Sequence, residues 1–599
     1  MAPRKFPILP LLLAAMAAAA VPAHVGAAPP LPGAFSWSTV VNNTDEMPGA
    51  CSKAKRTFNS YNQPSVNAAG LVVIRARSTG GPPCGPATHG IYTRDMSVDG
   101  SPIVRILDRS TPVPPPNNLY TNFVETPSFP RIDIWSNTIA TRGNHQPVYR
   151  YFLSDGSETR AGTTGVYANP FGDLITGASK LGAVPGFDFF EVPFANPDEY
   201  PWTMFDVFPG SPSVTNGSTI VFKGNYTVGG EGKTGVFYRD LEDEDHGGLS
   251  PVELIANNTD TVIPGTGTLF GSTSPPSAAT GQVVFAGFDN EESPTLGGIY
   301  LAPLQIQPPL TTLVRIGEWV PGESVRDTFN RLGEGGAFDG RYVGFWGAWG
   351  TETRTVRLYC PQEGNKDRIA YCNQKLVCED GTGTQKDPNS VCNDTSDPNY
   401  PICYQEKQVP VHQGIFVHDT VKRGTRIVAK TGARFDEFLF WNYSGKTPCV
   451  GIGGHGQEGA EDDGEPARWR SSAFVAVSGL RTAFKAVAAK YQQTDCGTCH
   501  GSSGTGSVNG SPQHARVVGI YLNRQPGQDA LTVASTGMDG NLIDPEAPAG
   551  SIVAEVGLER EGLRGDWLVI NAKMGIEGGT EEEGMAGVYV ARVPITPPR

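Results

Sequence analysis

The feature that most constrains the fold is a tripeptide, Gly followed by Ile or Val and then by Tyr or Phe. It recurs seven times, beginning at Gly90, Gly165, Gly235, Gly298, Gly414, Gly519 and Gly587. A repeated unit of this kind cannot bury its apolar side chains alone, so neighbouring units must stack against one another. Seven stacked units predict a closed ring.

Each tripeptide lies within a longer repeat of β-strand signals. Upstream stand β-branched and aromatic runs such as residues 219–222, which are typical of strands buried on both faces. A Pro-Ser pair, for example Pro212-Ser213, precedes several of these runs and predicts the start of an innermost strand, where a backbone donor is least needed. Downstream come an apolar run (252–255) and a polar turn (256–260). One unit therefore predicts four strands.

The composition agrees with a fold made of short strands and many turns. The chain contains 74 Gly and 50 Pro, and helical periodicity is nearly absent beyond the first residues. Such a pattern favours a sandwich, a barrel or a propeller, and a repeat of four strands favours the propeller. We therefore predict an all-β, seven-bladed β-propeller.

The two ends of the chain predict how the ring closes. The seventh unit lacks its fourth strand, because only a few residues follow its tripeptide. Residues 39–49 near the N-terminus match residues 254–265, which form the fourth strand and turn of another unit. Pairing the N-terminal strand with the last sheet would remove an open edge. We expect residues 29–599 to form one propeller closed in this way.

The N-terminal residues 1–28 predict export. Arg4 and Lys5 precede an apolar core and small residues, as in a secretory signal peptide. No other apolar run is long enough to span a membrane, so we expect a secreted, extracellular protein. The net charge of −14 argues against nucleic acid as a partner.

Ten cysteines in an exported chain predict five disulfides. Cys51 and Cys84 lie in loops that a propeller brings together, so we predict that they pair. A Cys-rich insertion at about 351–413 in blade 5 holds an odd number of cysteines, so one of them must find a partner outside it. The insertion contains Cys360, Cys372, Cys378, Cys392 and Cys403, and the remaining cysteines are Cys449, Cys496 and Cys499.

Seven Asn-x-Ser/Thr sequons agree with the secretory route if the host is eukaryotic. They are Asn42, Asn216, Asn225, Asn257, Asn393, Asn442 and Asn509. The alternative is chance, because the chain is rich in Ser, Thr and Asn.

Long insertions between the second and third strands predict a binding face. They cover residues 142–164, 351–413, 491–518 and 576–586, and antiparallel blades bring them to the same side as the turns between blades. The ligand candidates on that face are Trp319, Trp441, Asp45 and Asp260. The alternative is that the insertions are tolerated and have no binding role.

Two sequence patterns could bind a cofactor, but we do not predict that either of them does. Cys496-Gly497-Thr498-Cys499-His500 spells the attachment signature of c-type haem, although we also predict disulfides for both thiols, one with Cys449 and the other with the Cys-rich insertion. Acidic runs at 242–245, 458–465 and 581–583 offer carboxylates for calcium but match no calcium-binding pattern. We interpret them as solvated surface and predict no cofactor.

The order of the repeat resembles a group of uncharacterised, secreted propeller-like repeat proteins found mostly in bacteria. The resemblance rests on Pro-Ser, a Val-x-Phe strand, Gly-Ile-Tyr, an apolar strand and an Asn-Thr-Asp-x-(Ile/Val)-Pro-Gly turn, best matched by 212–265 and 276–322. It covers nearly the whole mature chain, except that the Cys-rich insertion departs from it. It implies a propeller fold and an exported location, and it carries over no catalytic residues.

Three functions remain open from the sequence. We predict a non-catalytic binding or scaffold module for extracellular carbohydrate or protein. The alternative is a polysaccharide hydrolase or lyase with carboxylates at the central channel, although no Gly-x-Ser-x-Gly or His-Glu-x-x-His motif occurs. The third is a haem protein that uses Cys496, Cys499 and His500. Charged side chains converging on the axis would favour chemistry.

Overall fold

The computed structural model describes residues 35–593, apart from 118–121, 127, 153–157, 184–185, 196–202, 243–249, 335, 362–365, 374–376, 380–384, 387–401, 445–466, 490–516 and 577–583. The predicted signal peptide and the haem motif lie outside the described residues. So do most of the acidic runs, as well as Cys392, Cys449, Asn393 and Asn509.

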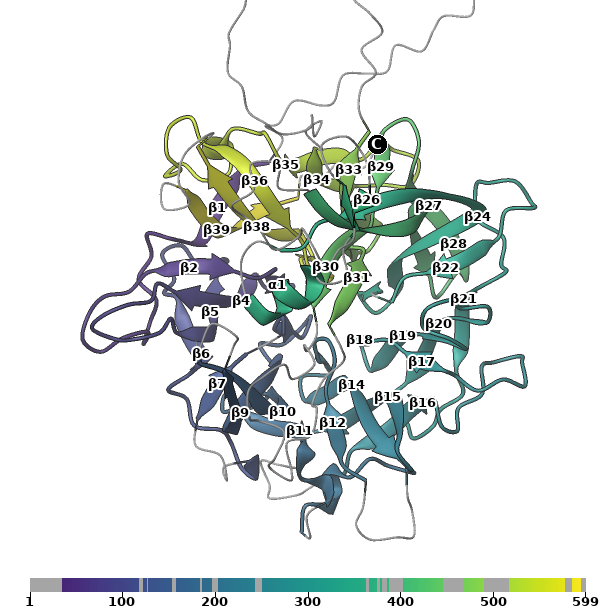
Figure 1. Cartoon of the computed structure of the whole chain (residues 1–599), viewed down its shortest axis with the longest axis horizontal. Helices are drawn as coiled ribbons and strands as arrows, with labels where there is room; N and C mark the ends of the chain where they lie inside the picture. Colours follow the sequence, from purple (N-terminus) through teal and green to yellow (C-terminus); the bar gives the residue numbers. More distant parts are fainter. Residues whose placement is uncertain are drawn as a thin grey trace, which may run out of the picture.

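Seven antiparallel sheets surround a central axis, as Figure 1 shows. The predicted seven-bladed propeller is therefore confirmed. Blade 1 contains β2 (Phe58–Tyr61), β3 (Ser65–Val66), β4 (Leu71–Ser78), β5 (His89–Asp95) and β6 (Val104–Asp108). Blade 2 contains β7 (Phe123–Glu125), β8 (Arg131–Ile132), β9 (Ile139–Phe152), β10 (Glu158–Ala168) and β11 (Ile175–Ser179). Blade 3 contains β12 (Phe205–Val207), β13 (Ser213–Thr215), β14 (Thr219–Val228), β15 (Glu231–Asp240) and β16 (Glu253–Asn257).

Blades 4 to 7 follow the same order. Blade 4 contains β17 (Ser272–Thr273), β18 (Ser277–Ala279), β19 (Gln282–Phe288), β20 (Gly297–Pro303) and β21 (Thr311–Arg315). Blade 5 contains β22 (Phe329–Leu332), β23 (Ala337–Phe338), β24 (Tyr342–Leu358), β27 (Ile402–Asp419) and β28 (Gly424–Lys430), extended by β25 (Val377–Glu379) and β26 (Gln385–Lys386). Blade 6 contains β29 (Phe435–Glu437), β32 (Val475–Ser478), β33 (Arg481–Ala488), β34 (Val518–Asn523) and β35 (Leu531–Ser535). Blade 7 contains β36 (Ile552–Gly557), β37 (Leu563–Arg564), β38 (Trp567–Gly575), β39 (Met585–Arg592) and β1 (Trp37–Asn42).

The N-terminal strand closes the ring, as predicted. β1 pairs antiparallel with β39, and the register places Trp37 opposite Ala591 and Asn42 opposite Gly587. In Figure 1 the purple β1 lies beside the yellow strands of blade 7. Val40 and Val41 of β1 are fully buried, so the closing strand also fills the core.

The first strand of every blade is broken into two pieces, which the four-strand prediction did not foresee. In blade 1, β2 pairs with the far end of β4, where Phe58 lies opposite Ser78, and β3 pairs with the near end, where Ser65 lies opposite Val73. The seven inner pieces are β3, β8, β13, β18, β23, β32 and β37, and they form a ring around the axis. In blades 1, 3 and 4 the break ends at the proline of a Pro-Ser pair, which cannot donate to the ladder, whereas blades 5 to 7 break without a proline directly before the inner piece.

The repeated glycine is required by close packing rather than by an unusual backbone angle. A Cβ at Gly235 would lie 2.7 Å from Cζ of Phe237 and 3.0 Å from the carbonyl oxygen of Ala256 on the next strand. The third residue of the tripeptide therefore folds its ring over the glycine. A register shift between Val236 and Phe237 accompanies this arrangement, as expected for a β-bulge.

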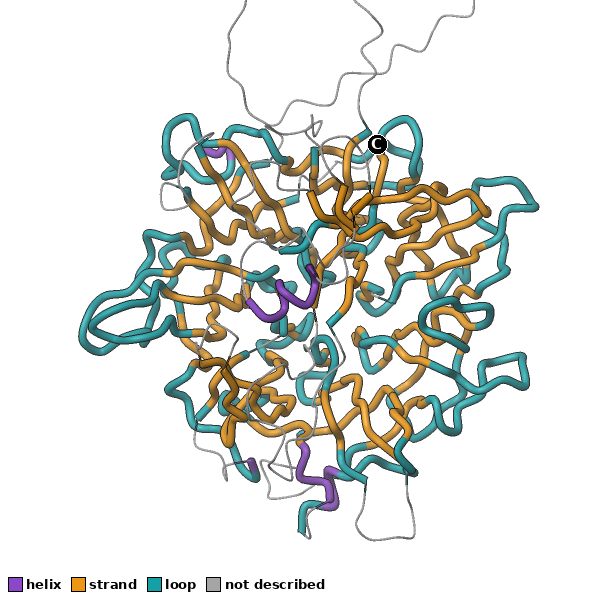
Figure 2. Tube along the Cα trace, viewed as in Figure 1, coloured by secondary structure: helices purple, strands orange, loops and turns teal. Residues whose placement is uncertain are grey.

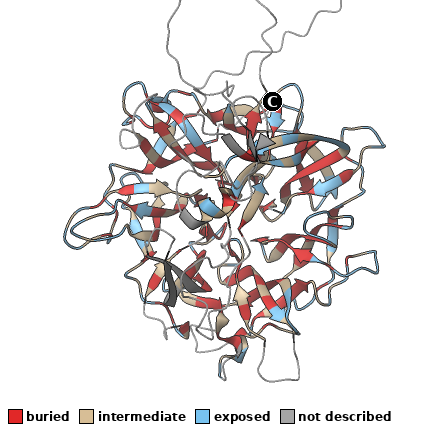
Figure 3. Ribbon diagram, viewed as in Figure 1, coloured by how far each residue is buried: buried red, intermediate tan, exposed pale blue. Residues whose placement is uncertain are grey.

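The aromatic residue of the tripeptide also holds the outer part of the blade's first strand in place. In six blades it packs edge-on against an aromatic side chain at, or just before, the outer piece of the first strand, which is a favourable ring geometry. The pairs are Phe58–Tyr92, Phe123–Tyr167, Phe205–Phe237, Phe270–Tyr300, Phe329–Phe416 and Phe435–Tyr521. Figure 3 shows the buried residues as red segments within the blades.

Helices are few in the described part of the chain, as Figure 2 shows. The α-helix α1 (Lys366–Asn373) lies in the Cys-rich insertion, and short 3-10 turns occur at Lys180–Ala183, Asp188–Phe190 and Gly540–Leu542. Two predicted insertions begin and end in strand rather than loop, because β9 and β10 continue past the sheet as a hairpin, and β24 and β27 do the same.

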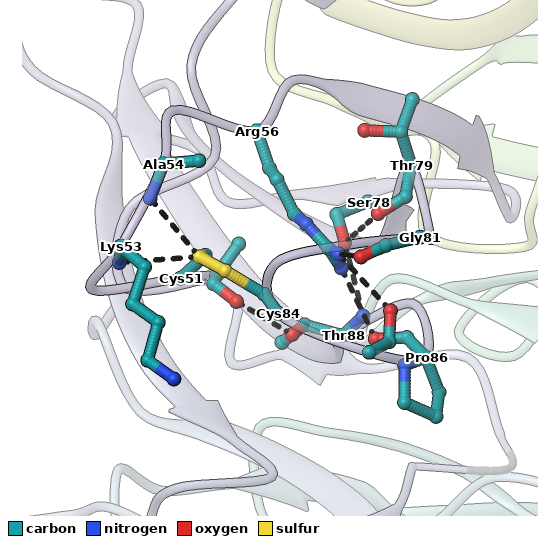
Figure 4. Close-up of a disulfide and its surroundings, with 12 residues drawn as sticks. Cys51, Lys53, Ala54, Arg56, Ser78, Thr79, Gly81, Cys84, Pro86 and Thr88 are labelled. Atoms are coloured by element: carbon teal, nitrogen blue, oxygen red, sulfur yellow. Dashed lines mark hydrogen bonds between the residues drawn. A yellow bond between two sulfur atoms is a disulfide. The ribbon is translucent and has the colours of Figure 1, made fainter.

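The predicted disulfide between Cys51 and Cys84 is present (Figure 4), with the two Cα atoms 5.9 Å apart. Arg56 supports the loop that carries Cys84, because its guanidinium donates to the carbonyl oxygens of Gly81, Gly85 and Pro86. A second disulfide joins Cys360 to Cys372. It anchors α1 to the end of the β24 segment.

Candidate functional site

A pocket of about 600 Å³ lies on the propeller axis. Every blade contributes to its wall at the break in its first strand, through Asn62, Ser128, Ser211, Pro275, Glu334, Ala473 and Arg560. Glu291 and Glu292, from the connection between the second and third strands of blade 4, also line it. The pocket thus opens on the face where the sequence predicted binding.

The connection between β36 and β37 crosses the axis and brings charged side chains into the ring. Glu559 in this connection pairs with Arg131 of blade 2, whose Nη2 lies 2.8 Å from Glu559 Oε1. Arg560 donates from Nη1 to the carbonyl oxygens of Pro275 and Gly336 at 3.4 Å. Blade 7 is therefore tied to blades 2, 4 and 5 through the axis.

Two further charges lie beside this connection. The carboxylate of Glu561 accepts the backbone N–H of Ile132 at 3.2 Å. Arg564 donates to the carbonyl oxygens of Val477 at 3.0 Å and Phe338 at 3.1 Å. Unlike Glu559 and Arg560, neither Glu561 nor Arg564 lines the pocket. Their contacts reach blades 2, 5 and 6.

The axial carboxylates have different electrostatic surroundings. Burial opposes ionisation of Glu559, but Arg131 and Arg560 outweigh it and lower the pKa of this carboxyl. Burial raises the pKa of Glu561, although Arg131 and Arg564 oppose the shift. Glu559 is therefore the more readily ionised of the two.

Three arginines line the pocket, and we call them the pocket arginines: Arg131, which is buried, and Arg142 and Arg560, which are half-buried. Burial lowers the pKa of Arg142 to about 10. The pKa of Arg560 is lowered to about 10 by burial and then by Arg131. Both groups stay protonated at neutral pH, but desolvation makes their charged form less favourable than it is in water.

A small hairpin forms another part of the wall. β30 (Phe440–Ser444) and β31 (Arg468–Ser472) pair with each other and are inserted into the break in the first strand of blade 6. We call them the hairpin cap. Tyr443 of the cap packs with Cys372 of α1, so the insertions of blades 5 and 6 support each other. In Figure 1, α1 and the cap lie near the centre of the ring.

Trp441 of the hairpin cap is the predicted ligand residue that the structure places in the pocket. Its side chain is half-buried, and its indole N–H has no hydrogen-bond acceptor among the described residues. An indole with this combination of apolar face and unused donor suits a ligand that is itself amphipathic.

The other three predicted ligand residues lie elsewhere. Trp319 is 48% exposed in the connection between blades 4 and 5, where its indole donates to the carbonyl oxygens of Glu323 and Ser324. Asp45 accepts the backbone N–H of Asn42 at 2.9 Å. Asp260 accepts the side-chain amide of Asn257 at 3.4 Å. These aspartates shape turns between blades and do not line the axial pocket.

The sequons fall in different environments. Asn42 and Asn257 are buried, and their side chains form hydrogen bonds within the turns and with Asp544, so neither is accessible to a glycan in the fold. Asn216 is exposed, and Asn225 is half-buried. Asn442 is exposed on the hairpin cap and lines the pocket.

The described residues contain no cluster of three or more His, Cys, Asp or Glu side chains arranged to hold a metal ion. Within the same part of the chain, no helix has the length and apolar character needed to cross a membrane.

The axial connection and the hairpin cap were not predicted from the sequence. A signal for the first was present, because Glu559-Arg560-Glu561 stands before the last long strand, where other units carry Pro-Ser. No repeat signal marked the cap, because it is an insertion.

No protein-family model and no curated protein matches the sequence. Among solved structures, the chain is similar to a member of the GH130 family of mannoside phosphorylases, a family described as containing hydrolases of β-1,2 mannosidic linkages in Candida mannan. The identity is 14%, with 53% of this chain and 91% of that chain covered and a TM-score of 0.24. The same four values describe the match to a glycosyl hydrolase from Bacteroides ovatus.

The tricorn protease matches at 10% identity, with 91% of this chain and 47% of that chain covered and a TM-score of 0.16. Similarities this low transfer no activity. The function must therefore be argued from the pocket.

Proposed function

We propose that this protein is an extracellular, non-catalytic propeller that binds a carbohydrate in the axial pocket. The observation that carries the proposal is the pocket itself, whose volume of about 600 Å³ falls in the range of small-molecule sites. It combines an aromatic face, Trp441, with amide groups from Asn62 and Asn442. Sugars need both an apolar surface for the ring and polar partners for the hydroxyl groups.

Charged side chains do converge on the axis, as expected for an enzyme, but the surroundings of Glu559 favour binding over hydrolysis. Glycosidases need a carboxyl group that is protonated before the reaction, so that it can donate to the leaving oxygen. The arginines beside Glu559 lower its pKa and keep it ionised. Arg131 also occupies this carboxylate with two donors, Nε at 3.1 Å and Nη2 at 2.8 Å. We therefore assign Glu559 to the support of the pocket.

A glycan array with the purified mature protein tests this proposal. The protein is best produced in the bacterial periplasm, where disulfides form and Asn442 at the pocket carries no glycan. We expect binding to a defined set of glycans and a loss of about 10- to 100-fold in affinity for Trp441→Ala, as for an aromatic residue at the centre of a binding site.

Trp319→Ala is the matched control, because Trp319 is exposed outside the pocket. It should bind as the wild type does. Cleavage of a bound glycan, or equal losses in both variants, would contradict the proposal.

A further inference from the structure

A second pocket lies on the opposite face of the propeller, and we call it the opposite pocket. Its volume is about 260 Å³, and none of the described residues lines both this pocket and the axial one. The opposite pocket lies where the first and second strands of blades 2, 3 and 4 are connected, at residues 133–138, 216–218 and 280–281. In an antiparallel blade this end is opposite the connection between the second and third strands, which lines the axial pocket in blade 4.

The connection of blade 2 is the longest of the three and carries an exposed tryptophan. Trp135 is 76% exposed, against 48% for Trp319. Its indole forms no hydrogen bond or ring contact with the described residues. Exposure alone indicates little, because single apolar side chains are common on protein surfaces. The argument for a site therefore depends on how Trp135 is held and on what surrounds it.

Hydrogen bonds from two neighbouring blades fix the backbone that carries Trp135. The Asp133 carboxylate accepts the backbone N–H of Trp135 at 2.7 Å and that of Gly217 in blade 3 at 3.2 Å. Asn67 of blade 1 donates from Nδ2 to the carbonyl oxygen of Ser136 at 3.0 Å. The tryptophan is thus presented from a fixed position, which reduces the entropy lost when a ligand binds.

The accessible polar groups of the opposite pocket are neutral. Its charged residue, Asp133, is only 5% exposed, and its carboxylate already accepts backbone N–H groups from Trp135, Ser136 and Gly217. Asn216 and Thr280 also line the pocket and are exposed, and neither side chain forms a hydrogen bond within the described part of the chain. A ligand with hydroxyl groups would therefore find free donors and acceptors, whereas a charged ligand would find no free counter-charge.

We propose that the opposite pocket is a second carbohydrate site, in which one neutral sugar ring stacks on Trp135 and forms hydrogen bonds with Asn216 and Thr280. A pyranose ring presents an apolar C–H face beside its hydroxyl groups, which matches an exposed indole beside an amide and a hydroxyl. The volume lies below the range of about 300–1,000 Å³ for drug-sized ligands, so it suits one ring rather than a longer chain. This site goes beyond the proposed function, because it does not depend on what the axial pocket binds.

Fluorine NMR of the protein labelled with fluorotryptophan tests the site, because each tryptophan gives its own signal. Trp135→Phe and Trp441→Phe assign the signals of the two pockets. The probes are the methyl glycosides of glucose, galactose, mannose and N-acetylglucosamine and the corresponding disaccharides. They are titrated into protein from the bacterial periplasm, where disulfides form and Asn216 carries no glycan. We expect at least one probe to shift the Trp135 signal to saturation, whether or not the Trp441 signal moves.

Two variants assign this binding to the side chains of the opposite pocket. In a Trp441→Ala background, which silences the axial pocket, Trp135→Ala should weaken binding of that probe by about 10- to 100-fold, measured by saturation-transfer NMR. Asn216→Gly should also weaken it, because it removes the amide and tolerates the φ of 55° at this position.

Trp319→Ala in the same background is the matched control, because Trp319 lies outside both pockets, and it should bind as the parent does. Thermal melting of each variant shows whether it is folded. Asn216→Gly keeps the Trp135 signal, so it tests the site even if Trp135→Ala does not fold.

The outcomes separate this inference from the proposed function. A Trp135 signal that no sugar shifts would overturn the second site, as would tighter binding of choline than of every sugar. Sedimentation with phosphatidylcholine vesicles that depends on Trp135 would also overturn it, because the indole would then belong to a lipid-binding surface. Sugar binding at Trp135 with none at Trp441 would keep this inference and overturn the proposed function.

Discussion

Arg131 and Glu559 are 428 residues apart in the sequence and form a buried ion pair on the propeller axis, with Nη2 and Oε1 2.8 Å apart. Arg131 belongs to β8 in blade 2, and Glu559 belongs to the connection inside blade 7. The pair therefore joins blades 2 and 7, which are far apart along the chain and are not neighbours in the ring. It also forms part of the pocket wall.

We expect Glu559→Gln to lower the free energy of unfolding by about 3–5 kcal/mol, because it leaves the buried Arg131 without its counter-charge. Urea denaturation followed by tryptophan fluorescence measures the change. Glu46→Gln is the control, since Glu46 pairs with Lys55 at the surface, where both side chains are more than half exposed. A midpoint for Glu559→Gln that matches the wild type would show that the pair does not support the ring.

The destabilisation by Glu559→Gln should depend on pH. The folded pKa of Glu559 lies below its unfolded value, so the carboxylate contributes stability above the usual glutamate range of about 4.3. This contribution is lost as the pH falls through the folded pKa. The difference between wild type and variant should therefore be largest near neutral pH and shrink in acid, measured as urea midpoints from pH 7 to pH 3.5. A difference independent of pH would contradict the assignment.

The repeated glycine can be tested within a single strand. Gly235→Ala should destabilise the protein by about 1–3 kcal/mol, the range for overpacking, because its Cβ would lie 2.7 Å from the ring of Phe237. Gly232 lies in the same strand, β15, and a Cβ there would meet nothing within 4 Å. Gly232→Ala should therefore have little effect on the thermal melting temperature. Equal shifts for the two variants would disprove the packing argument.

The strand register predicts a third disulfide in the insertion of blade 5. Cys378 of β25 is directly opposite Cys403 of β27. Opposed residues in an antiparallel pair have Cα atoms about 4.5–5.5 Å apart, which suits a disulfide. Non-reducing peptide mapping by mass spectrometry should find Cys378 linked to Cys403, and Cys392 linked to a cysteine outside the insertion. A link from Cys378 to any other cysteine would refute this pairing.

The propeller could be predicted from sequence because its signals are local and repeated. The tripeptide at Gly235 specifies a tightly packed third strand, and in six of the seven blades the ring of the tripeptide's aromatic residue lies against its own glycine. Cys51 and Cys84 could be paired because both lie at defined positions of one repeat. The closure of the ring by the N-terminal strand could be predicted because residues 39–49 match the fourth strand of another blade. In the structure β1 pairs with β39 as expected.

The residues that line the pocket were harder to predict, because a residue's place in a loop does not indicate where that loop lies relative to the axis. Trp319 and Trp441 both stood near turns in the sequence, yet only Trp441 lines the axial pocket. Trp441 reaches it because the hairpin cap is inserted where the first strand of blade 6 breaks. An insertion carries no repeat signal, so its path depends on packing against α1.

By itself, the sequence determined the number of blades, the strand that closes the ring and one disulfide, since each depends on side chains within one repeat or on a match between two repeats. Only the tertiary structure decided the pocket and its charge. Arg131, Arg142 and Arg560 come from different parts of the chain, and ring closure brings them to the same cavity. Their arrangement around one cavity is a property of that closed ring, and no local pattern encodes it.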